Sequence, residues 1–161
     1  MEGLSNIYIY KTLKKDMECS NVFIGVYSSD NLDIKKCVQQ ENFIAICNLS
    51  KEGKVGSHFV TIFGTKDELL YIDSFALPCT TSASLYNSLK QLPNRKIITL
   101  LKRPIQSSLS EYCGFFCILF TCLFDFQRFP NVDNLKPFNK HILYNNDKIC
   151  IENIKMLIKR N

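Results

Sequence analysis

The sequence contains no tryptophan, only two histidines, and few glycines or prolines. Its longest apolar run, Gly114–Phe124, is too short to span a bilayer. The first residues lack the basic-then-apolar order of a signal peptide. Because no repeat and no Pro/Gly-rich linker divides the chain, we expect a single domain over residues 1–161 of an intracellular protein without membrane partners.

No C-x-x-C pair occurs, which argues against a structural zinc site, and we expect neither a metal nor another cofactor. The chain has eight cysteines, but 46% of its residues are hydrophobic, enough for a core without disulfides. We therefore expect thiols. The net charge of +5 comes from scattered Lys and Arg residues, which are typical of a solvated surface but also permit weak, nonspecific attraction to DNA.

Hydrophobic periodicity predicts an α+β protein with a mostly antiparallel central sheet packed against helices. The expected helices are Ser5–Met17, Thr81–Leu92, Cys113–Phe126 and Asp147–Lys159, the last with Ile151, Ile154 and Ile158 facing inward. The expected strands are a meander of Asn42–Leu49, His58–Gly64 and Leu69–Phe75, followed by a buried strand at Lys96–Leu101. Because Cys113–Phe126 is apolar on nearly every side, it should lie in the middle of the fold.

Cys113 stands where a polar loop, QSSLSEY, gives way to this apolar helix. Free N–H groups and the positive end of the helix dipole stabilise a thiolate at such a position. Gly114 would leave room for backbone and substrate to approach. Most cysteines are inert buried thiols, and Cys117 and Cys122 fit that description.

His58 and Asp73 become neighbours if the second and third runs of the meander form a hairpin. A two-residue turn places position 58 opposite position 73, and a four-residue loop shifts the pairing by two, which keeps both on one face. Their Cβ atoms would lie roughly 4.5–8 Å apart. The carboxylate could then hold the Nδ1 proton and leave Nε2 to deprotonate a thiol. Taken alone, a histidine such as His58 is more often structural, and Asp73 could be a turn-capping acid.

Gln106 lies seven residues before Cys113. A side-chain amide there can donate to a developing oxyanion together with the Cys113 backbone N–H, although a loop glutamine is more often solvated.

In this order the blocks GSHF, YIDSF and QSSLSEYCG resemble the adenovirus endopeptidase (adenain) family and its relatives, the SUMO- and ubiquitin-like-specific proteases. The resemblance covers most of the chain and implies a papain-like, adenain-like fold. It also implies that Cys113 is the nucleophile, His58 the base, Asp73 its orienter and Gln106 an oxyanion donor. Two features depart from adenain: Phe59 stands where the family usually has tryptophan, and adenain has Glu in place of Asp73, whereas SUMO proteases have Asp.

The sequence thus predicts a cysteine endopeptidase. The resemblance implies a virion-maturation protease of a DNA virus or virus-like mobile element. Such an enzyme would act in the host nucleus and virion, cleaving capsid or core precursors beside small residues. An activating peptide, which could pair with an exposed Cys79, or DNA would be accessory. Two alternatives stay open: a deSUMOylase or deubiquitinase-like isopeptidase, and a protease fold kept as a non-catalytic binding module.

Overall fold

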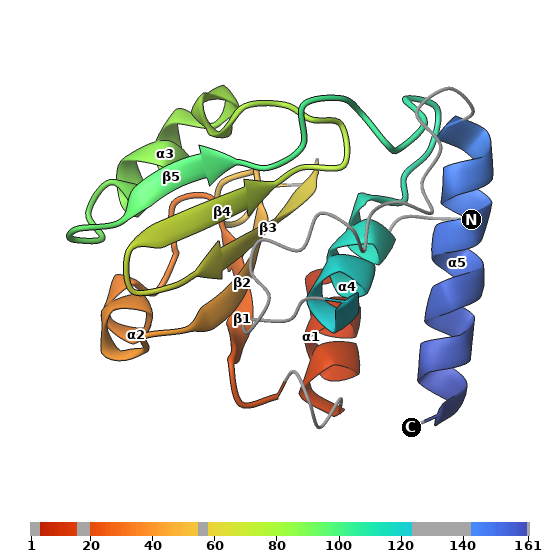
Figure 1. The fold of residues 1–161 in the computed structure, drawn as a ribbon, viewed down its shortest axis with the longest axis horizontal. Coiled ribbons are helices and arrows are strands. Elements are labelled where there is room, and N and C mark those ends of the chain that lie inside the picture. The colour runs from red at the N-terminus through yellow and green to blue at the C-terminus, as the bar shows by residue number, and fades with distance from the viewer. Residues whose placement is uncertain (1–3, 16–19, 55–57, 124–142, 161) are drawn as a thin grey trace.

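The computed structural model describes residues 4–15, 20–54, 58–123 and 143–160. A five-stranded sheet has the order β1-β2-β3-β4-β5 (Figure 1). The strands are β1 (Phe23–Ser28), β2 (Phe43–Asn48), β3 (Phe59–Gly64), β4 (Glu68–Ile72) and β5 (Lys96–Thr99). The helices are α1 (Asn6–Lys15), α2 (Ile34–Gln39), α3 (Ala83–Leu89), α4 (Cys113–Leu123) and α5 (Leu143–Arg160), with a 3-10 turn, η1, at Cys79–Thr81.

The α+β class and the β2-β3-β4 meander are confirmed. The sheet is antiparallel at its centre, whereas β1 pairs with β2 and β5 pairs with β4 in parallel. The parallel pairs have α2 and α3 in their connections, as parallel neighbours require a crossover. Neither β1 nor α2 is among the elements expected from periodicity.

Helices cover both faces of the sheet. On one face α1 and α4 pack against the strands, and α5 lies beyond α4 (Figure 1). On the other face α2 and α3 pack against a second apolar cluster. Along β3, Phe59 and Phe63 belong to the first cluster and Val60 and Ile62 to the second. Burial on both sides explains why the strand reads as an unbroken apolar run.

Several element boundaries differ from those expected. Strand β4 ends at Ile72 rather than Phe75, and α3 covers Ala83–Leu89 rather than Thr81–Leu92. The run at residues 96–101 forms an edge strand only over Lys96–Thr99. Its expected burial is wrong for the strand, which is half-exposed because no strand pairs with its outer side in the sheet order, whereas Leu101 beyond it is buried.

Helix α5 begins at Leu143, four residues before the expected start at Asp147. In α5, Ile154 is buried and Ile151 only half-buried, while the side chain of Ile158 lies outside the described residues. The expected end of the helix that starts at Cys113, residues 124–126, also lies outside them. Among the described residues, none of the helices combines the length and apolar character needed to span a membrane.

Candidate active site

The β3–β4 hairpin brings His58 and Asp73 together at one end of the sheet. Thr61 pairs with Ile72 and Gly64 with Leu69, so four residues connect the paired ends, as in the second of the two registers considered. His58 immediately precedes β3, and Asp73 immediately follows β4. The His58 carbonyl also accepts a hydrogen bond from the Leu49 N–H at 2.8 Å, which anchors the histidine backbone to the end of β2.

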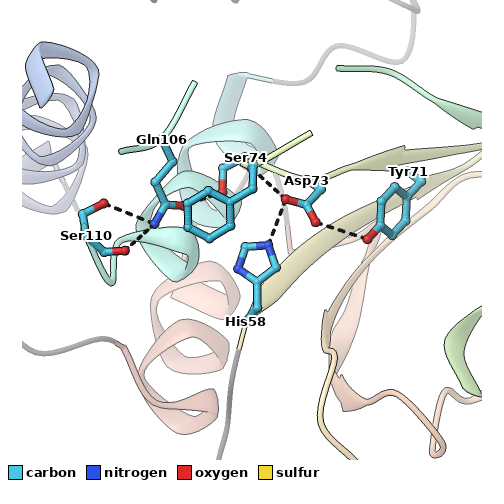
Figure 2. A network of polar contacts seen from close by, with 7 residues as sticks. His58, Tyr71, Asp73, Ser74, Gln106 and Ser110 are labelled. Carbon is cyan, nitrogen blue, oxygen red and sulfur yellow. Dashed lines mark hydrogen bonds and ion pairs between the residues drawn. The ribbon is translucent and has the colours of Figure 1, made fainter. Parts of the chain in front are cut away.

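The imidazole meets the carboxylate through Nε2. His58 Nε2 lies 2.9 Å from Asp73 Oδ1, and both side chains are buried (Figure 2). Because an ionised carboxylate can only accept, Nε2 carries the proton and Nδ1 is the atom free to act as base. The expectation that Nδ1 faces the acid is therefore wrong, and the two ring nitrogens exchange roles.

Asp73 is held by donors from three directions. Its Oδ1 also accepts from the Phe75 backbone N–H at 2.7 Å, and Oδ2 accepts from the Tyr71 hydroxyl at 3.3 Å. The Ala76 N–H bonds the Asp73 carbonyl at 2.8 Å, and Ala76 itself adopts a positive φ of 56°. The acid thus both caps the turn after β4 and orients the histidine, because its Oδ1 accepts from the backbone N–H two residues on and from the imidazole.

Two aromatic residues complete this pair and were missed from the sequence. The Phe75 ring stacks on the imidazole, with centroids 4.8 Å apart and planes at 27°. Tyr71 is fully buried, and burial followed by the Asp73 charge raises its hydroxyl pKa, so the hydroxyl stays a donor. Strand alternation offers a signal for Tyr71, because residues two apart share a face. The turn beginning at Asp73 offers no such rule for Phe75.

Cys113 is the first residue of α4, and its side chain is 9% exposed. The first intrahelical bond runs from the Phe116 N–H to the Tyr112 carbonyl, so the Cys113 N–H precedes the bonded turns. The predicted helix N-terminus at Cys113 is confirmed. The space beside Gly114, by contrast, is not free for substrate, because a Cβ there would lie 3.1 Å from both Ile9 and Leu4. The missing side chain at Gly114 therefore allows α1 and the residue Leu4 before it to pack closely against α4.

The thiol and the imidazole act on each other. Burial, the largest single influence, lowers the pKa of His58, but the hydrogen bond with Asp73 and the interaction with Cys113 together raise it to about 9. His58 Nδ1 is buried and makes no well-formed hydrogen bond within the described part of the chain. Catalytic pairs without substrate commonly show such loose geometry. The raised pKa favours a protonated imidazole at neutral pH.

Gln106 lies in the same region, and its amide is engaged. Its Nε2 donates to the Ser110 carbonyl at 2.9 Å and to the Ser110 hydroxyl at 3.2 Å, and its Oε1 accepts from the Ser74 hydroxyl (Figure 2). The side chain is 1% exposed, so it is not a solvated loop glutamine. Its role as an oxyanion donor stays a prediction, which requires one amide hydrogen to turn from Ser110 to the substrate.

The remaining described cysteines have other surroundings. The structure describes seven, all free thiols. Cys117 and Cys79 are 2% and 3% exposed, and burial raises the pKa of each. The expected exposure of Cys79 is therefore wrong, because η1 turns it into the cluster under α3. Within the described residues, no group of three or more His, Cys, Asp and Glu side chains could hold a metal ion.

No protein-family model matches this sequence, and no curated protein matches it. Solved structures that are similar to it include the following two. An AvrA deletion variant with IP6 and CoA is 19% identical, with a TM-score of 0.48 over 71% of this chain and 46% of that one. The ASFV pS273R protease is 15% identical, with a TM-score of 0.47 over 81% of this chain and 62% of that one. The chain thus spans about half to three-fifths of their lengths. One of the two is a protease, and neither distinguishes adenain from its relatives or assigns a role to any residue here.

Proposed function

We propose that the protein is a cysteine endopeptidase with Cys113 as nucleophile, His58 as base and Asp73 as the acid that orients the base. The observation that carries this proposal is the buried His58–Asp73 pair at 2.9 Å, whose imidazole also interacts with the thiol at the start of α4. A buried histidine between a carboxylate and a thiol is the arrangement that activates a sulfur nucleophile.

The reaction runs through an acyl-enzyme. His58 Nδ1 holds the proton of Cys113, and the thiolate adds to the scissile carbonyl to form a carbon–sulfur bond. The carbonyl oxygen takes the negative charge until the carbon–nitrogen bond breaks. Protonated His58 then gives its proton to the departing amine. Water, deprotonated by the same histidine, hydrolyses the thioester and restores the thiol. Throughout, Asp73 keeps Nε2 protonated.

The oxyanion would lie against the Cys113 backbone N–H and Gln106. The first of these donors is available at a helix N-terminus. Gln106 contributes if its amide leaves Ser110 when substrate enters. Each such donor is worth on the order of 100-fold in rate.

As for substrate, the sequence resemblance favours an extended polypeptide cut beside small residues, in the processing of viral capsid or core precursors within the host nucleus and virion. An activating peptide or DNA belongs to the same proposal, although the burial of Cys79 argues against a disulfide to that residue. A second candidate is cleavage of ubiquitin-like conjugates, because the orienting acid is Asp73 as in SUMO proteases. Ubiquitin-like fusions assayed beside viral precursor peptides separate the two.

The deciding experiment incubates wild-type protein and Cys113→Ala with a peptide library and reads cut sites by mass spectrometry. We expect cuts from the wild type alone. Equal cutting by both proteins would end the protease proposal. A binding module would instead show no cutting and a Cys113 that reacts with iodoacetamide no faster than a model thiol.

A further inference from the structure

The loop between β5 and α4 is held by hydrogen bonds from two sides at residues 105–107. From the β4 side, the Ser74 carbonyl accepts from the N–H groups of Ile105 at 2.9 Å and Gln106 at 3.1 Å. From the α5 side, Asn146 Nδ2 donates to the Ile105 carbonyl at 2.9 Å. Asp147 Oδ1 accepts from the Ser107 N–H at 3.3 Å. The peptide groups on either side of Gln106 are thus bonded to a helix some 40 residues later in the chain.

Asn146 and Asp147 are polar side chains that are almost completely buried. They are 0% and 1% exposed, on a helix whose other buried side chains, among those described, are the apolar Cys150 and Ile154. Asn146, Cys150 and Ile154 are spaced by four and share one face. Burying an amide and a carboxylate costs free energy unless hydrogen bonds offset it, and apolar side chains would fill the same space without that cost.

Asp147 is linked to Ser110 through Ser107. Ser107, whose N–H donates to Asp147 Oδ1, also accepts the Ser110 hydroxyl at its carbonyl, at 3.0 Å. Ser110 is the residue whose carbonyl and hydroxyl receive the Gln106 amide. The carboxylate is therefore linked through Ser107 to the residue that holds the Gln106 amide.

We propose that Asn146 and Asp147 are positioning residues that set Gln106 in place for the oxyanion. The inference rests on the proposed function. It adds that α5, which is distant in sequence from the catalytic residues, holds the loop that carries Gln106. Neither residue touches the substrate. Both act by fixing the backbone from Ile105 to Ser107, and an oxyanion donor displaced by about 1 Å loses much of its effect on the transition state.

Two reactions of the Cys113 thiol separate this role from general structural support. Iodoacetamide alkylates the thiol: sulfur bonds to the CH₂ carbon as iodide leaves, and the amide oxygen of the reagent gains no charge. Para-nitrophenyl acetate acylates the thiol: sulfur adds to the ester carbonyl, an oxyanion forms, and the carbon–oxygen bond breaks as nitrophenolate leaves. Only the second reaction needs the oxyanion donors. Cys113→Ala supplies the background rate for both.

We expect Asn146→Ala and Asp147→Ala to lower the acylation rate about tenfold or more, while alkylation stays within about twofold of wild type. Asp147→Asn keeps an acceptor for the Ser107 N–H and should retain most of the acylation rate. The matched control is Asn153→Ala, on the same helix, because Asn153 donates to the Ile149 carbonyl of α5 itself. This control should change neither rate.

Unchanged acylation in Asn146→Ala and Asp147→Ala would overturn the inference, and so would an equal fall of both reactions, which indicates general structural loss. If Asn146→Ala fails to fold, the pair Asp147→Ala and Asp147→Asn decides, since wild-type alkylation certifies an intact Cys–His pair in each. If the wild-type thiol itself reacts no faster than a model thiol, the proposed function fails first, and the inference with it.

Discussion

Phe75 fixes both members of the His58–Asp73 pair. Its ring stacks on the imidazole at a centroid distance of 4.8 Å. Its backbone N–H donates at 2.7 Å to Asp73 Oδ1, the same oxygen that receives His58 Nε2. The ring therefore restrains the base and the amide restrains the acid.

Phe75→Ala separates these two functions, because it removes the ring and keeps the N–H. We expect a loss of about tenfold in kcat/KM, since the imidazole gains freedom to leave the line between acid and thiol. The iodoacetamide rate of Cys113 should fall in parallel. Phe75→Tyr keeps an aromatic face and serves as the control. Wild-type kinetics in the alanine variant would show that Asp73 alone orients the ring.

Asp73→Asn tests the charge of the acid at nearly constant shape. An amide cannot stabilise an imidazolium as a carboxylate does, and its NH₂ group can face Nε2 and favour the wrong tautomer. We expect turnover to fall by about 100-fold to 10,000-fold. Tyr71→Phe removes one 3.3 Å hydrogen bond to Oδ2 and should cost only severalfold. Full activity in Asp73→Asn would remove this residue from the mechanism.

The sequence could predict the partners in the site because they depend on local rules. Strand alternation and the length of the β3–β4 connection place His58 beside Asp73, and the change from polar loop to apolar run places Cys113 at a helix start. These relations use contacts close in the chain, so period and turn length suffice.

Contacts between distant segments decided the rest. Which imidazole nitrogen faces Asp73 depends on how the ring is turned between the carboxylate and the Phe75 ring, and periodicity carries no such information. The use of Gly114 depends on the approach of Leu4 and Ile9. The hydrogen bond from the Gln106 amide to Ser110 depends in turn on a loop that is hydrogen-bonded to α5. None of these has a local sequence signature.

The stability of the protein should fall as pH rises through the titration of His58. Its folded-state pKa, about 9, lies above the ordinary value of 6.5. The folded state therefore binds the proton more tightly. This contribution is fully present below pH 6.5 and is lost as pH rises through about 9. It amounts to at most a few kcal/mol. Urea unfolding between these limits, with His58→Gln as the control, measures it, and parallel profiles for the two proteins would contradict the assignment.

Cys117 provides the matched thiol for testing whether reactivity belongs to position rather than residue type. It lies one turn after Cys113 on α4, is 2% exposed, and burial raises its pKa well above the ordinary value. Cys117→Ser should cost about 1–2 kcal/mol of unfolding free energy, because it buries a hydroxyl in an apolar cluster, and should leave the iodoacetamide rate of Cys113 unchanged. Cys113→Ala should remove the fast-reacting thiol with little change in stability. A fast-reacting thiol that survives in Cys113→Ala and disappears in a folded Cys117→Ser would identify Cys117 as the reactive cysteine. That result would contradict the proposal, because Cys117 lies one turn away from the N–H groups that stabilise a thiolate.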